Sequence, residues 1–86
     1  MTTDTINGTD AVDTITFTTT STTVNAGEGA NTITATSGDN VITSGGGADT
    51  IAVTSGNNII NAGAGANTIT ATSGINEINT GDGADT

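Results

Sequence analysis

Branched aliphatic residues recur every nine residues along the whole chain. They are Ile6, Ile15, Val24, Ile33, Ile42, Ile51, Ile60, Ile69 and Ile78. β-Branched side chains favour extended backbone. Short strands that repeat at a fixed period are typical of solenoids, in which neighbouring repeats bury each other's apolar faces. The pattern therefore predicts an all-β protein in which each nonapeptide contributes one short strand.

Glycine placement doubles this period to eighteen residues. Residues 27–44, 45–62 and 63–80 align as three units, and Gly81 begins a fourth. The first half of each unit reads Gly-x-Gly-Ala-Asp/Asn-Thr-Ile, and the second half contains a single Gly within Thr-Ser-Gly-x-Asn. We therefore expect a parallel β-solenoid with 18-residue coils, each made of two nonapeptides. Stacked coils would lie about 4.8 Å apart.

The repeat is less regular at the N-terminal side. Residues 1–25 keep the aliphatic spacing but have few of the glycines, whereas residues 26–86 follow the full pattern. We interpret residues 1–25 as a degenerate N-terminal coil or cap and residues 26–86 as the regular solenoid. The last repeat stops at Thr86, where an Ile is due next. We expect a fragment of a longer repeat array, or a unit that a neighbour continues.

Alternation along each strand assigns an inner and an outer face. The aliphatic residue of every nonapeptide is expected to point inward, together with a second small or apolar residue in the first-half strands. The expected core is Ile6, Ile15, Phe17, Val24, Ile33, Ala35, Ile42, Ile51, Val53, Ile60, Ile69, Ala71 and Ile78.

Threonine dominates the outer face of the first-half strands. The array comprises Thr14, Thr16, Thr18, Thr32, Thr34, Thr36, Thr50, Thr54, Thr68, Thr70 and Thr72, with Ala52 as an interruption. Its hydroxyls would stand about 7 Å apart along a strand and about 4.8 Å apart across strands. Such an array resembles the flat Thr surfaces of ice-binding solenoids. Thr is also a common residue on the exposed face of any sheet, so both interpretations stay open.

The formal charge is −9, and the chain has no Lys, Arg or His. Nucleic acid is not an expected partner, because no side chain could neutralise phosphates. Membrane insertion is not expected either, because no apolar stretch is long enough to span a bilayer. The absence of His, Cys and Lys argues against catalysis, so we expect no enzyme. A cation is the natural complement of this charge.

Residues 44–52, Ser-Gly-Gly-Gly-Ala-Asp-Thr-Ile-Ala, resemble the nonapeptide GGxGxDxUx of the repeats-in-toxin (RTX) family, where U is a large aliphatic residue. Residues 80–86 form a second, shortened copy. The resemblance is clear over residues 26–86 and weak over residues 1–25. It implies a parallel β-roll, Ca²⁺ held between the turns of successive coils, and secretion. The N-terminus lacks the basic and apolar regions of a signal peptide.

The resemblance also identifies candidate calcium ligands in the glycine turns. These are Asp13, Asn31, Asp49, Asn67, Asp85, Gly27, Gly29, Gly45, Gly47, Gly63, Gly65, Gly81 and Gly83. Asp and Asn alternate, which doubles the spacing of carboxylates that would otherwise repel by about 3 kcal/mol at ~4.8 Å and an effective dielectric near 20. The alternative is a calcium-independent ladder. In the other turns, where Asn40, Asn58 and Asn76 align, we expect stacked amides rather than calcium.

The sequence therefore predicts an extracellular structural calcium-binding β-solenoid segment of a surface layer, an adhesin or a self-assembling filament. It would be secreted or displayed at the cell surface without an N-terminal signal peptide. Open strand edges favour self-association, as an end-to-end homopolymer or as the continuation of a longer repeat array. The alternative function is ice binding through the Thr array.

Overall fold

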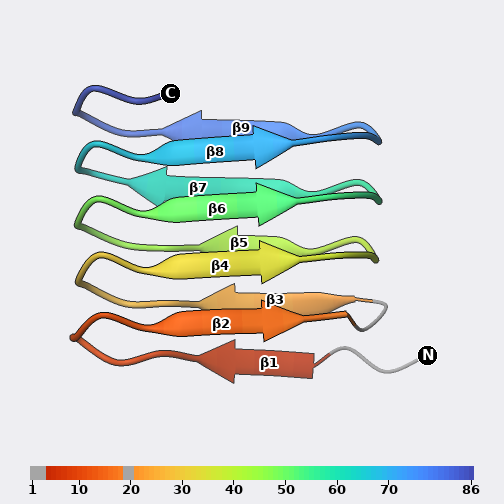
Figure 1. Cartoon of the computed structure of the whole chain (residues 1–86), viewed down its shortest axis with the longest axis horizontal. Coiled ribbons are helices and arrows are strands. Elements are labelled where there is room, and N and C mark those ends of the chain that lie inside the picture. Colours follow the sequence, from red (N-terminus) through yellow and green to blue (C-terminus); the bar gives the residue numbers. More distant parts are fainter. Residues whose placement is uncertain (1–3, 19–20) are drawn as a thin grey trace.

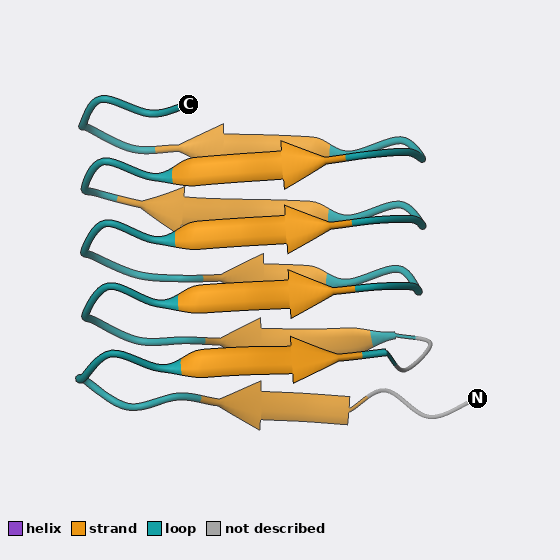
Figure 2. Ribbon diagram, viewed as in Figure 1, coloured by secondary structure: helices purple, strands orange, loops and turns teal. Residues whose placement is uncertain are grey.

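The computed structural model describes residues 4–18 and 21–86, which form a stack of short strands joined by turns (Figure 1). No helix occurs in these residues (Figure 2). The strands are β1 (Asp4–Asn7), β2 (Thr14–Phe17), β3 (Thr22–Asn25), β4 (Thr32–Ala35), β5 (Val41–Thr43), β6 (Thr50–Val53), β7 (Ile59–Gly63), β8 (Thr68–Ala71) and β9 (Glu77–Thr80). Residues 1–3 and 19–20, which belong to the predicted N-terminal cap, lie outside the described residues.

Odd-numbered and even-numbered strands form two separate sheets. One sheet has the order β1-β3-β5-β7-β9 and the other has the order β2-β4-β6-β8. All pairs are parallel, and each residue pairs with the residue eighteen positions later, as in Ile15↔Ile33 and Ile42↔Ile60. Among the described strands, the single register shift lies between Asn61 and Gly63, where β7 meets β9. The predicted all-β parallel β-solenoid with 18-residue coils is confirmed.

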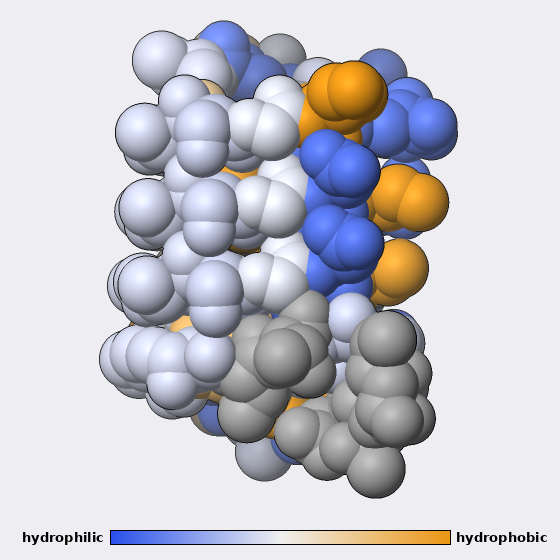
Figure 3. Space-filling model, turned by 90° about the vertical axis from the view of Figure 1, so that its right-hand side faces the viewer, coloured by the Kyte–Doolittle hydropathy of each residue, from blue (hydrophilic) through white to orange (hydrophobic). Residues whose placement is uncertain are grey.

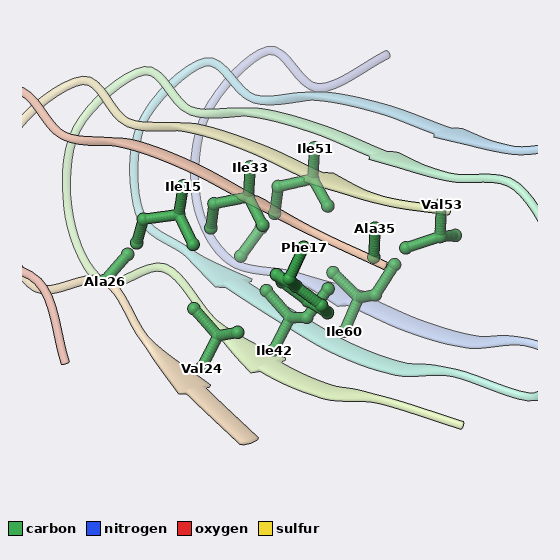
Figure 4. Packing of buried hydrophobic residues seen from close by; sticks show 11 residues of the cluster. Ile15, Phe17, Val24, Ala26, Ile33, Ala35, Ile42, Ile51, Val53 and Ile60 are labelled. Atoms are coloured by element: carbon green, nitrogen blue, oxygen red, sulfur yellow. The ribbon is translucent and has the colours of Figure 1, made fainter. Parts of the chain in front are cut away.

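Aliphatic side chains from both sheets meet in a thin core. Figure 4 shows Ile15, Ile33 and Ile51 in one row, opposite a row that contains Ile42 and Ile60. The buried cluster consists of Ile15, Phe17, Val24, Ala26, Ile33, Ala35, Ile42, Ile51, Val53, Ile60 and Ala62. Ile6, Ile69 and Ala71 are partly buried and pack against it. Of these side chains, the ones that strand alternation placed on the inner face are confirmed to point inward.

The expectation that Ile78 is buried is wrong. Its side chain is 43% exposed, although it pairs in register with the fully buried Ile60. The reason is its place in the stack, since β9 has a neighbouring strand on one side only. Ala26 and Ala62 are the opposite case, because they are fully buried although the alternation did not identify them.

The molecule is a flattened block of 34 × 24 × 14 Å. The turns lie at the two ends of its longest axis, and the coils stack at right angles to that axis (Figure 1). Residues 4–18 and 21–86 enclose no pocket. They also include no helix with the length and apolar character that crossing a bilayer requires.

The N-terminal strands continue the solenoid in register. β1 pairs with β3 from Asp4↔Thr22 to Asn7↔Asn25, and β2 pairs with β4 from Thr14↔Thr32 onward. The loss of glycines before residue 26 has therefore not changed the coil length. Whether residues 1–25 act as a cap stays a prediction.

Candidate metal centre

The candidate ligands lie in the turns that lead from the five-stranded sheet to the four-stranded sheet, which we call the first edge. One residue of each turn stacks into a column, and each column residue directly precedes a Thr that pairs with a neighbouring coil. The column consists of Asp13, Asn31, Asp49, Asn67 and Asp85. Asn31, Asp49 and Asn67 are each only 1% exposed. The eighteen-residue period thus brings the predicted column together and buries its middle.

Glycines allow these turns to stack closely. Gly29 has a φ of 98°, a conformation that side chains resist. A β-carbon there would also lie 2.7 Å from the carbonyl oxygen of Ala11 in the preceding coil. Gly46 differs, because its φ is ordinary and an added β-carbon would meet only the flexible end of Glu28.

In every column residue after Asp13, one side-chain oxygen accepts a hydrogen bond from the preceding coil. Oδ1 of Asn31 accepts the backbone N–H of Asp13 at 2.9 Å, and Oδ1 of Asp49 accepts that of Asn31 at 2.8 Å. Asn67 and Asp85 continue the series at 2.9 Å each. Asp and Asn are equivalent in this role, since both offer an acceptor oxygen at Oδ1.

The second side-chain atom separates Asn from Asp. Nδ2 of Asn31 donates to the carbonyl oxygens of Gly27 and Gly29 at 3.1 and 3.2 Å. Nδ2 of Asn67 makes the same pair of bonds in its own turn, to the carbonyls of Gly63 and Gly65. In both turns the amide group satisfies the carbonyls that crowd the inside of the turn.

Asp49 has no proton donor at the equivalent atom when it is ionised. Its Oδ2 is buried and, among the described residues, it is the one buried side-chain polar atom without a hydrogen-bond partner. By the repeat, the carbonyls that correspond to those held by Asn31 belong to Gly45 and Gly47. A buried carboxylate oxygen is costly unless a cation or a donor meets it. No Lys, Arg or His exists anywhere in the chain to do so.

The two outer Asp residues of the column have different surroundings. Both carboxylate oxygens of Asp13 accept hydrogen bonds from Thr9, including a 2.7 Å bond from its backbone N–H to Oδ2. This turn has Thr9 and Ala11 where the other turns have glycines. Asp85 binds Asn67 through Oδ1 but is only half-buried. Of the column residues, Asp49 would therefore be stabilised most by a bound cation, because its buried Oδ2 has no hydrogen-bond partner.

Glu28 is already engaged elsewhere on the first edge. Its Oε2 accepts the backbone N–H of Gly46 in the next coil at 2.9 Å. The described residues contain no group of three or more His, Cys, Asp or Glu side chains placed to hold a metal ion. A metal at Asp49 would thus rely on one carboxylate together with backbone carbonyls. Oxygen ligands of these two kinds are those that Ca²⁺ uses, so the residues present fit calcium.

The opposite turns, which we call the second edge, carry the expected amide ladder. Nδ2 of Asn40 donates to Oδ1 of Asn58 at 3.0 Å, and Nδ2 of Asn58 donates to Oδ1 of Asn76 at 3.0 Å. The same oxygens accept backbone N–H groups across the coils. Figure 3 looks onto this edge, where polar side chains form stripes along the stack beside exposed apolar ones.

Comparison with known families gives this arrangement a name. The model of the RTX calcium-binding nonapeptide repeat (HemolysinCabind, four copies) matches residues 25–60 and 61–86, which is more than half of the chain. The chain belongs to the RTX repeat family. RTX nonapeptide repeats bind calcium, so this chain is a structural calcium-binding repeat segment. No curated protein and no solved structure matches it.

The RTX pattern did not reveal several contacts that are present in the structure. Thr9 binds Asp13, Glu28 binds Gly46, and Ser44 is fully buried with its hydroxyl bonded to the carbonyl of Ala62 at 2.8 Å. For Ser44 a signal exists, since it falls in the same column as Ala26 and Ala62. The assignment of individual calcium ligands from the RTX motif stays a prediction.

Proposed function

We propose that this RTX segment is an extracellular structural element of a surface layer, an adhesin or a self-assembling filament, in which calcium stiffens the stack of coils. The observation that carries the proposal is the buried Oδ2 of Asp49, which has no hydrogen-bond partner in a chain without basic side chains. Secretion is typical of RTX repeat proteins and fits this role.

Calcium would be held by Asp49 together with backbone carbonyls of the glycine turn. Its positive charge would neutralise the buried carboxylate and interact favourably with the carbonyl oxygens of the turn. Extracellular calcium modules commonly bind with Kd of about 10⁻⁴–10⁻³ M. A site of this kind would be filled outside the cell and empty at cytosolic calcium levels.

The test is thermal unfolding with calcium and with a chelator, followed by the β-sheet circular dichroism signal. Calcium at about 100 times its Kd should stabilise the fold by about 2.7 kcal/mol. For a domain of this size that corresponds to a rise in Tm of roughly 10–20 °C. Magnesium at the same concentration serves as the control for ionic strength. If the chelator leaves both the signal and the Tm unchanged, calcium has no structural role.

We infer that the segment is not an enzyme. RTX β-rolls are structural folds, and the chain lacks His, Cys and Lys. The polar side chains buried on the two edges are engaged in bonds between coils, which is a structural task.

Ice binding through the Thr array is a second candidate, favoured by its register. Thr14, Thr32, Thr50 and Thr68 pair across the four-stranded sheet in one row. A parallel row contains Thr16, Thr34, Ala52 and Thr70. These Thr side chains are exposed, except for Thr34, which is half-buried. The candidate predicts inhibition of ice recrystallisation at micromolar protein, weakened by Thr50→Val and Thr68→Val together. Absence of inhibition by the unmodified chain would remove it.

Self-association is the partner we propose, as an end-to-end homopolymer or within a longer repeat array. Its support is that the outer strands of each sheet, such as β8 and β9, have a neighbouring strand on one side only. Such edges pair readily with further strands. Electron microscopy with calcium should show filaments, and isolated short rods with and without calcium would exclude the homopolymer.

A further inference from the structure

The two kinds of residue in the first-edge column divide the turns into two chemical classes. In an Asn turn, Oδ1 accepts a backbone N–H from the preceding coil and Nδ2 donates to two glycine carbonyls. In the Asp49 turn, Oδ1 makes the same bond to the preceding coil, but Oδ2 brings a negative oxygen where Asn brings a donor. The rest of the turn keeps the same spacing of glycines.

The orientation of the Asn amides is fixed by their partners. Turning the amide of Asn31 by half a rotation would place its NH₂ group against the backbone N–H of Asp13 and its oxygen against the carbonyls of Gly27 and Gly29. Like groups would then face each other, and four hydrogen bonds would be lost, including the 3.5 Å bond from Nδ2 to the carbonyl oxygen of Ser44. Asn31 therefore cannot turn its oxygen toward a cation without breaking its bond to the preceding coil. Asn67 is held in the same way.

We propose that Asn31 and Asn67 are built-in replacements for calcium, so that calcium binds in Asp turns of this column and not in Asn turns. The proposal rests on the calcium-binding function proposed above and determines which coils carry it. In an Asn turn the amide NH₂ takes the place that the ion has in an Asp turn, since its hydrogens, which carry partial positive charge, point at the glycine carbonyls. Asp has two acceptor oxygens, one for the preceding coil and one for the ion, and Asn has only one.

The alternation has a consequence for the stability of the calcium-free chain. Asn turns are satisfied without metal, so they hold neighbouring coils together when calcium is absent. The Asp49 turn is then the weak point, because Oδ2 of its carboxylate is buried without a hydrogen-bond partner. Calcium dependence of the whole segment thus follows from the number of Asp turns and not from the number of repeats.

Two substitutions test the proposal from opposite directions, in the full chain. Asn31→Asp should add a calcium site, seen as about one more ion per chain by titration calorimetry, and should lower the Tm in chelator. Asn57→Asp is the control of equal charge, because Asn57 is exposed on the second edge beside Asp39, and it should add no calcium site.

Asp49→Asn should raise the Tm in chelator above that of the unmodified chain. The rise should exceed that of Asp39→Asn, which removes the same charge at an exposed position.

The outcomes separate this proposal from the proposed function. An unmodified chain that binds calcium, with an Asn31→Asp chain that binds the same number of ions, would overturn the inference and leave the calcium function intact. An unmodified chain that binds no calcium would overturn the function. In that case the Tm values in chelator still show whether Asn at position 49 makes a more stable turn than Asp. Asp49→Asn that is no more stable in chelator than Asp39→Asn would contradict the inference.

Discussion

At the scale of single residues, one atom decides the chemistry of a turn. Asn31 and Asp49 have nearly the same shape and the same bond through Oδ1, at 2.9 and 2.8 Å. They differ in whether the other atom donates or accepts, and this difference decides whether the turn needs a cation. The surrounding backbone is equally specific, since glycines are required there for two separate reasons, conformation and close stacking.

Replacing Gly29 should show both requirements. Gly29→Ala would force a side chain into a left-handed φ and against the carbonyl of Ala11. We expect it to lower the free energy of unfolding by at least about 1–2 kcal/mol, measured by urea denaturation in calcium buffer. Gly46→Ala is the matched control, because only the movable carboxylate of Glu28 stands in its way. Equal losses for the two variants would show that the backbone conformation of Gly29 is not the cause.

At the scale of strands, burial alternates so regularly that neighbouring isoleucines have opposite surroundings. In β7, Ile60 is fully buried between the sheets, whereas Ile59 points outward and is 42% exposed. The register Ile42↔Ile60 continues the row of core side chains through the sheet. Stability should therefore depend on which of two identical residues is shortened.

Ile60→Ala should reduce the free energy of unfolding by about 2–5 kcal/mol, because it leaves a cavity in a core that is only one side chain thick on each sheet. Ile59→Ala should cost no more than about 1 kcal/mol, through its weaker preference for extended backbone. Both values come from urea denaturation in the same buffer. A larger loss for Ile59→Ala than for Ile60→Ala would mean that the faces of β7 are assigned the wrong way round.

Strand positions and faces were predictable because they follow from periods of two, nine and eighteen residues. Ile33 and Ile51 had to be buried once the register was known. Ile78 was expected to be buried for the same reason and is exposed, because burial also depends on a neighbouring coil on each side. The period describes each coil alike and carries no information about its place in the stack.

The sequence predicted that the residues of the candidate site align in a column, but it did not predict which hydrogen bonds they make. Sequence spacing aligns Asn31, Asp49 and Asn67, but the direction of each amide depends on which carbonyls and N–H groups lie within reach. Thr9 binds Asp13 for a similarly local reason, in a turn without the usual glycines. The nonapeptide motif specifies neither the direction of the amides nor the contact between Thr9 and Asp13.

At the scale of the whole molecule, stability is the sum of contacts between adjacent coils, as expected for solenoids. The second edge contributes an uninterrupted amide ladder from Asn40 to Asn76 that needs no metal. On the first edge, turns in which an Asn amide bonds the glycine carbonyls alternate with turns that contain a carboxylate. We therefore expect the second edge to hold the coils together in chelator, and the first edge to respond to calcium.

The most direct test is calorimetric titration of calcium into the unmodified chain, the Asp49→Asn chain and the Asp39→Asn chain. The two variants lose the same charge, but only Asp49 places a buried oxygen without a hydrogen-bond partner inside a glycine turn. The account predicts that Asp39→Asn binds as many ions as the unmodified chain and that Asp49→Asn binds at least one fewer. Equal stoichiometry and affinity in all three chains would contradict it.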